Sequence, residues 1–186
     1  MNDGKKLPGY VSLDEIGKGA PYVLRAGQGE HIAVRSSLRT LLTRKEDTEG
    51  NMGMTYCEGD TAPATPPHYH HDTTEGVYVL SGVLRVWQDD RQGNRMVIDL
   101  HPGDYGLLPT GWTHSWAFAA PKTRFLAFYA PGGFEGTLHY LDPQGAPSAQ
   151  QLSETQERFD VVWTPDYPLV RESEQTGTLA SEKPSA

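Results

Sequence analysis

Cysteine and long apolar runs are both scarce in this sequence. Cys57 is the single cysteine among 186 residues, so the chain can form neither an internal disulfide nor a zinc knuckle, and we expect a small buried side chain there. No stretch approaches the roughly 18 consecutive apolar residues of a membrane span, and the N-terminus lacks the basic-then-apolar plan of a signal peptide. The sequence therefore predicts a cytoplasmic protein that does not bind membranes.

Positive charge is also in deficit. The chain has 16 Lys and Arg against 24 Asp and Glu, a formal net charge of -8 at pH 7. Such a surface repels phosphate backbones and anionic lipids, so nucleic acid is not an expected partner. The length suits one domain with a sizeable core and short additions.

Glycine and proline are plentiful, with 20 and 14 copies, and they separate short apolar runs. This pattern is typical of an all-β sandwich or barrel. The expected strands cover residues 22–24, 32–34, 38–43, 52–57, 76–80, 83–88, 96–100, 105–108, 113–118 and 123–130.

Short connections and a polar end complete the predicted organisation. Ser81-Gly82 and the loop 89–94 predict that three successive strands form an antiparallel meander of hairpins. A helix is expected over Ser153–Phe159, where Ser-x-x-Gln opens a run of helix formers. We expect an N-terminal arm over 1–20, a barrel over 21–145, and a C-terminal helix followed by a mobile tail over 146–186.

Metal-ligating side chains gather in His68-Tyr69-His70-His71-Asp72-Thr73-Thr74-Glu75, and His114 follows later in the chain. Residues two apart on a strand share a face, so His68 and His70 point the same way, and a turn allows Glu75 to join them. Three imidazoles and a carboxylate suit nickel, cobalt, iron, manganese, copper or zinc. Because closed structural zinc sites favour thiolates, we expect one open, catalytic site for a divalent transition metal per chain.

The spacing of these residues resembles the two signatures of the cupin superfamily, His68-x-His70-x4-Glu75-x6-Gly82 and Gly103-x5-Pro109-x-Gly111-x2-His114. Two positions depart from the pattern, because Ala62 stands where glycine is usual and Phe118 where asparagine is usual. The resemblance implies a double-stranded β-helix, or jelly-roll barrel, with the metal inside.

A narrower resemblance to the quercetinases, the quercetin 2,3-dioxygenases, covers about residues 68–141. It rests on Gly103-Asp104-Tyr105-Gly106, on Tyr129-Ala130-Pro131-Gly132-Gly133-Phe134-Glu135 and on Leu138-His139-Tyr140-Leu141. With one cupin domain, the chain resembles the single-domain bacterial forms, which implies a homodimer. The resemblance implies cleavage of a flavonol by O2 with release of carbon monoxide and a depside, and favours nickel or cobalt, then manganese or iron, then copper.

Substrate contacts and a base can also be assigned. Val77 shares the strand face of Glu75, while Trp116 and Phe118 share that of His114, which predicts an apolar and aromatic pocket for a flat polyphenol. The resemblance adds three further pocket residues, Phe125, Tyr129 and Phe134. Glu75 is the predicted general base for the flavonol hydroxyl as well as a metal ligand.

Two other functions stay open. A cupin isomerase or decarboxylase acting on a small acid should present Arg or Lys inward to hold the carboxylate. The strands of Glu75 and His114 show no basic residue on the ligand face, which leaves Arg85 and Arg124 as the candidates. A non-catalytic, pirin-like binding cupin could keep the same metal ligands.

Overall fold

The computed structural model describes residues 8–16, 18–34, 37–140, 147–171 and 176. The predicted tail beyond Arg171 and the first seven residues lie outside these ranges, apart from Thr176. The strands are β1 (Glu30–Val34), β2 (Ser37–Thr43), β3 (Gly53–Gly59), β4 (His68–Tyr69), β5 (Thr74–Ser81), β6 (Leu84–Asp89), β7 (Arg95–Leu100), β8 (Tyr105–Leu108), β9 (Thr113–Phe118), β10 (Thr123–Ala130) and β11 (Val162–Trp163). The helices are α1 (Leu13–Ile16), α2 (Ala149–Arg158) and the 3-10 helices η1 (Lys45–Asp47) and η2 (Phe134–Tyr140).

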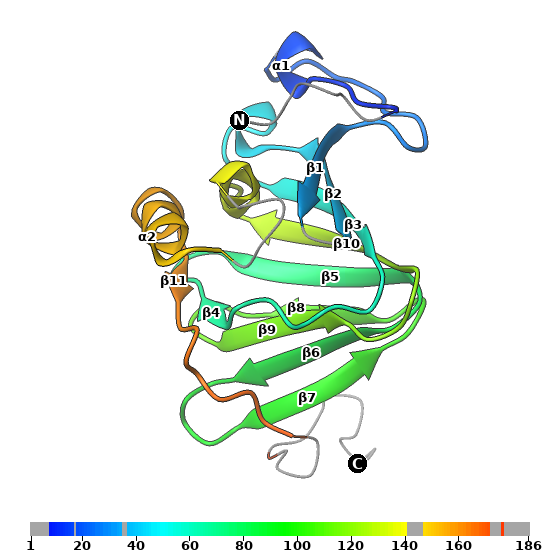
Figure 1. The fold of residues 1–186 in the computed structure, drawn as a ribbon. Helices are drawn as coiled ribbons and strands as arrows, with labels where there is room; N and C mark the ends of the chain where they lie inside the picture. Colours follow the sequence, from blue (N-terminus) through cyan, green and yellow to red (C-terminus); the bar gives the residue numbers. More distant parts are fainter. Residues whose placement is uncertain (1–7, 17, 35–36, 141–146, 172–175, 177–186) are drawn as a thin grey trace, which may run out of the picture.

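The strands form two sheets that face each other (Figure 1). One sheet has the order β1-β2-β3-β10-β5-β8 and the other β11-β4-β9-β6-β7. All strand pairs named in these two sheets are antiparallel. The predicted all-β jelly-roll barrel is therefore confirmed, and its interior is the space between the two sheets.

The predicted meander is wrong at its first connection. Ser81-Gly82 carries the chain from β5 in one sheet to β6 in the other, and only β6 and β7 form the expected hairpin. Gly82 has a φ of +73°, and a side chain at this position would overlap Thr123. A glycine therefore permits this close crossing, whereas a short loop alone does not distinguish a hairpin from a change of sheet.

Most strand predictions agree with the structure, but residues 22–24 form no strand. The C-terminal helix is also displaced from its predicted position. It spans Ala149–Arg158, and its N-cap is Ser148, whose side chain accepts a hydrogen bond from the N–H of Gln151. The sequence holds two Ser-x-x-Gln patterns in this region, and the earlier one, Ser148 to Gln151, caps the helix.

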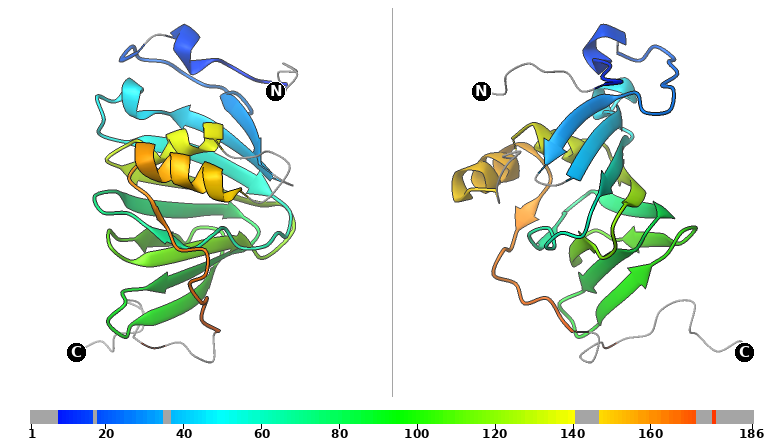
Figure 2. Two further views of the ribbon diagram at one scale, coloured as in Figure 1. Left: turned by 60° about the vertical axis from the view of Figure 1, so that its left-hand side comes forward. Right: turned by 45° about the vertical axis from the view of Figure 1, so that its right-hand side comes forward.

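Side chains alternate along the strands between the interior and the surface. On β5, Glu75, Val77 and Val79 are buried while Tyr78 and Leu80 are exposed. The core gathers residues from both sheets and includes Cys57, which is buried as expected. At one end of the barrel β11 pairs with β4, and α2 lies beside them (Figures 1 and 2). Among the described residues, no helix combines the length and apolarity needed to cross a bilayer.

Candidate metal centre

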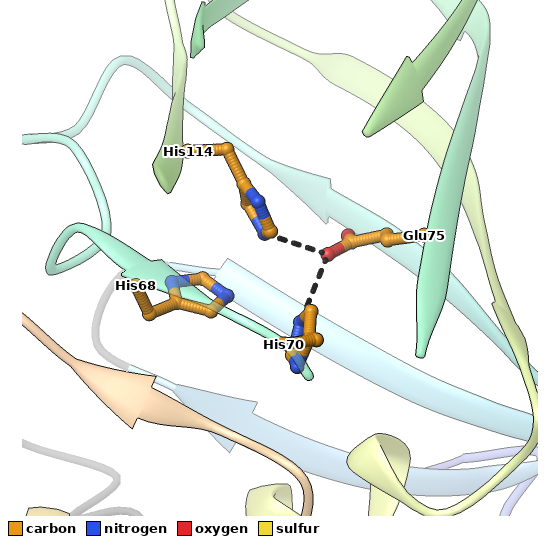
Figure 3. Close-up of side chains that lie close together, drawn as sticks. All are labelled: His68, His70, Glu75 and His114. Carbon is orange, nitrogen blue, oxygen red and sulfur yellow. Dashed lines mark ion pairs between the residues drawn. The ribbon is translucent and has the colours of Figure 1, made fainter. Parts of the chain in front are cut away.

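Three segments of the barrel bring together four side chains that could bind a metal ion. His68 opens β4, His70 follows that strand directly, Glu75 lies near the start of β5, and His114 is on β9. His68 and His114 are paired across β4 and β9. Figure 3 shows all four side chains converging on one point, and their ligand atoms lie within 4.8 Å of one another. The residues chosen from sequence spacing are thus neighbours in space.

Glu75 lies at the centre of the contacts within this group. Its Oε2 atom is 3.4 Å from Nε2 of His114 and 3.9 Å from Nε2 of His70. Each of the four residues is at most 2% exposed. Four polar side chains buried in such close contact need partners to offset their loss of hydration.

The three imidazole rings are held by backbone carbonyl groups. Nδ1 of His68 donates to the carbonyl of Pro66 at 3.0 Å, and Nδ1 of His114 donates to that of Trp112 at 3.1 Å. Nδ1 of His70 contacts the carbonyl of Asp160. A carbonyl can only accept, so each Nδ1 carries the proton and each Nε2 presents a lone pair.

The remaining atoms of the group match the needs of a divalent cation. His68 Nε2, His70 Nε2, Glu75 Oε2 and His114 Nε2 are buried and have no hydrogen-bond partner. Burial lowers the pKa of His68 well below its ordinary value, and burial together with His114 lowers the pKa of His70. Neutral imidazoles and a carboxylate are the forms that bind metal, so the donor set fits one divalent transition ion.

Asp160 is a supporting residue that the sequence analysis missed. Besides its carbonyl contact with His70, its carboxylate accepts hydrogen bonds from the backbone N–H groups of His71, Asp72 and Thr73 at 2.6–2.8 Å. Burial alone would raise the pKa of Asp160, but these N–H groups outweigh it and hold the pKa below its ordinary value. The loop between His70 and Glu75 is therefore fastened to the C-terminal segment.

An aromatic cavity adjoins the group at His68. Four of the predicted substrate residues line it, namely Trp116, Phe118, Tyr129 and Phe134. Val77 and Phe125 do not line it, because both are fully buried in the core, with Phe125 packed behind the rings of Trp116 and Phe118. Strand alternation gives the face of a residue but not its depth, which explains the difference.

The cavity is narrow, and the neutral hydroxyphenyl group of Tyr129 forms part of its wall. Its volume is about 100 Å³, below the roughly 300–1,000 Å³ of typical small-molecule pockets. Part of the wall comes from η2 and from Trp163 of β11, outside the two sheets' central strands. Burial and the nearby Glu75 raise the pKa of Tyr129 well above 10, so its hydroxyl can donate a hydrogen bond.

Arg39 of β2 is a second residue that the sequence analysis missed. It lines the cavity and is 6% exposed. Arg85 and Arg124, the basic residues singled out from the sequence, do not line it. Arg85 pairs with Asp99 at 2.6 Å, and Arg124 pairs with Glu58 at 3.4 Å. The sequence pattern of β2 gave no sign that Arg39 points inward, because apolar and polar residues do not alternate regularly along this strand.

Comparison with known proteins agrees with the fold and the site. The cupin domain family matches residues 59–129. Quercetin 2,3-dioxygenase of Bacillus subtilis (strain 168) is 31% identical over 135 residues, which cover 72% of this chain and 39% of that protein. Quercetin 2,3-dioxygenase of Aspergillus japonicus is 32% identical over 75 residues, 40% of this chain and 21% of that protein. The chain thus matches well under half the length of either relative.

Solved structures show the same fold. The oxalate decarboxylase of Bacillus subtilis aligns with a TM-score of 0.50 over 85% of this chain and 43% of that one, at 15% identity. Two antiparallel sheets enclosing a His-His-Glu-His group define a metal-binding cupin. Residues 59–129 match the cupin domain family, the two sheets have the cupin fold, and the sequence is similar to the quercetin 2,3-dioxygenases.

Proposed function

We propose that this protein is a metal-dependent dioxygenase that cleaves the heterocyclic ring of quercetin and related flavonols with O2, releasing carbon monoxide and a depside. The observation that carries this proposal is the aromatic cavity, which shares His68 with the four-residue group. Similarity to two quercetin 2,3-dioxygenases supports it. A cytoplasmic location and a homodimer remain predictions from the sequence.

His68, His70, Glu75 and His114 would hold the metal through their unpartnered atoms. A bound divalent cation would supply Lewis-acid stabilisation of an ionised substrate oxygen. The donor set does not choose the metal, and the preference for nickel or cobalt over manganese, iron and copper comes from the family resemblance.

Glu75 is the residue we assign as general base. Its Oε2 atom is buried and accepts no hydrogen bond from the protein. A carboxylate has two oxygen atoms, so one can bind the metal while the other takes the proton of a flavonol hydroxyl that enters the group. The three imidazoles cannot do this as readily, because each Nε2 would serve as a ligand and each Nδ1 already holds a proton against a backbone carbonyl.

The cavity walls would position the flavonol for attack by O2. Trp116, Phe118 and Phe134 offer flat apolar surfaces for stacking, and the Tyr129 hydroxyl offers a hydrogen bond. The cavity is smaller than a three-ring ligand needs, so its walls would have to move apart on binding. Substrate orientation is then the main contribution of the protein to the reaction.

A second candidate function has one observation in its favour. Arg39 supplies the inward cation that a cupin isomerase or decarboxylase would need for a small carboxylic acid. The aromatic walls and the sequence relatives favour the flavonol. A binding cupin of the pirin kind would use the same walls without turnover.

One experiment separates these functions. The metal-loaded protein is mixed with quercetin without oxygen, and air is then admitted while flavonol absorbance, oxygen and carbon monoxide are followed. A dioxygenase bleaches the flavonol, consumes O2 and releases carbon monoxide. A spectral shift without oxygen consumption would identify a binding protein, and the absence of any spectral change would exclude flavonols as ligands.

A further inference from the structure

Arg39 lies inside the barrel in an environment that is unusual for a cation. Its guanidinium carbon is 4.8 Å from the centre of the Trp116 ring and 5.1 Å from that of Phe118. These cation–π contacts hold the planar group against the cavity wall but satisfy none of its N–H donors. Across the sheet, Arg39 is opposite Cys57, a neutral thiol whose pKa burial raises to about 11.

The charge of Arg39 has no counterion in the described part of the chain. No ion pair involves Arg39 there, and no Asp or Glu is among the residues that line the cavity. Its Nη1 atom is buried without a hydrogen-bond partner. By contrast, Arg44, whose side chain is 11% exposed, is paired with Asp14 and Asp47. An unpaired buried cation is strongly unfavourable unless a ligand supplies the missing charge.

We propose that Arg39 is the specificity residue of the cavity and binds an anionic oxygen on a planar aromatic ligand, at the end of the ligand remote from the metal. Trp116 lies two residues beyond His114 on β9, about 7 Å further along the strand, and the guanidinium lies over its ring. One aromatic ring system can bridge that distance. A ligand oxygen would meet Nη1 while the ring lies against Trp116 and Phe118.

The ligand oxygen can be an acidic phenol or a carboxylate, since a guanidinium binds both. The inference rests on the proposed function in one respect, namely that the natural ligand occupies this cavity. On the proposed function the oxygen is a phenolic hydroxyl of the flavonol, distinct from the hydroxyl that approaches Glu75. Arg39 would then favour flavonols that carry acidic ring hydroxyls over those that carry none.

Calorimetric titrations of the nickel-loaded protein under nitrogen test this, because turnover is then prevented. The first probe pair is quercetin and 3-hydroxyflavone, which keeps the 3-hydroxyl and lacks the other ring hydroxyls of quercetin. The second pair is benzoate and benzamide. We expect the parent to bind quercetin about tenfold tighter than 3-hydroxyflavone.

Arg39→Met keeps an apolar stem on Trp116, and it should reduce that preference to about threefold or less by weakening the binding of quercetin alone. Arg39→Lys should retain part of the preference, because it keeps the charge and loses the fork.

Arg124→Met is the matched control, since it removes an arginine of the same sheet that lies outside the cavity. It should leave both preferences unchanged, and thermal unfolding shows whether each variant is folded. A parent with no preference in either pair overturns the role of Arg39, whichever variants fold, and so does an unchanged preference in Arg39→Met. If neither flavonol binds, the flavonol proposal fails, and a preference for benzoate that Arg39→Met abolishes still supports the anion site.

Discussion

His68 and His114 are oriented locally, whereas His70 is oriented from far along the chain. The first two rings donate from Nδ1 to carbonyl groups two residues earlier, those of Pro66 and Trp112. The ring of His70 meets the carbonyl of Asp160, 90 residues away. Two ligands are therefore prepared by the strands that carry them, and the third depends on a segment added after the barrel.

This C-terminal segment is part of the site. Trp163 of β11 is paired with His68 of β4, and its ring centre is 4.8 Å from the His68 ring centre. Thr164 donates from its N–H to the carbonyl of Pro67 at 2.8 Å. Even the locally oriented His68 thus has β11 against its strand, so the segment supports two of the three histidines.

Removing a locally oriented ligand should have the largest effect. His114→Ala deletes a buried donor that no neighbouring side chain can replace, so elemental analysis should find almost no bound metal and activity should be lost. His71→Ala is the control, because His71 is an exposed neighbour of the ligands whose side chain is outside the group. Full metal occupancy in the His114 variant would remove that residue from the ligand set.

Glu75→Gln should separate metal binding from chemistry. The amide oxygen can still coordinate, but it cannot accept the hydroxyl proton, so we expect bound metal with turnover reduced about 100-fold or more. Steady-state oxygen consumption and metal analysis of the same sample provide the two measurements. Turnover within about tenfold of the parent would exclude Glu75 as the base.

Most strand bounds and the four candidate ligands could be predicted from the sequence. Strand bounds at 105–108, 113–118 and 123–130 agree with β8, β9 and β10 because apolar alternation and turn residues delimit each strand. His68, His70, Glu75 and His114 converge because their positions follow from the same alternation together with the cupin spacing. These features follow from strand patterns and motif spacing that are visible in the sequence.

The contacts between segments far apart in the sequence could not be predicted. Nothing in the sequence around Asp160 distinguishes it from other acidic residues, and its role appears only when the C-terminal segment folds back on β4. Arg39 is similar, because a strand pattern does not tell whether an inward arginine has a partner. The change of sheet at loop 81–82 could not be predicted for the same reason, because it depends on the pairing of β6 with β9.

Asp160→Ala should weaken the distant anchor without touching a ligand. The carboxylate would no longer fasten the N–H groups of His71, Asp72 and Thr73, so the loop carrying His70 should loosen. Loss of such outer contacts typically lowers metal affinity about 10–100-fold. Competition with a chelator measures this, and Asp166→Ala, an exposed acid later in the same segment, is the control. Unchanged affinity in the Asp160 variant would show that the barrel alone positions His70.

The pH dependence of the metal-free protein should show the smallest effect and compare His68 with His70. Burial lowers the pKa of both rings, and that of His68 lies well below 6.5. Below pH 6.5 the unfolded chain takes up protons that the folded chain refuses, so the free energy of unfolding should fall by up to about 1.4 kcal/mol per pH unit for each histidine. Denaturant unfolding between pH 7.5 and about 5 measures the slope. The contribution of His68 to this slope should extend to lower pH than that of His70, because the contacts of His70 with Glu75 and Asp160 raise its pKa partly back. His68→Gln should therefore flatten the plot of unfolding free energy against pH down to a lower pH than His70→Gln does. Equal slopes in the parent and the two variants would mean that these imidazoles take up protons at the same pH in the folded and the unfolded chain.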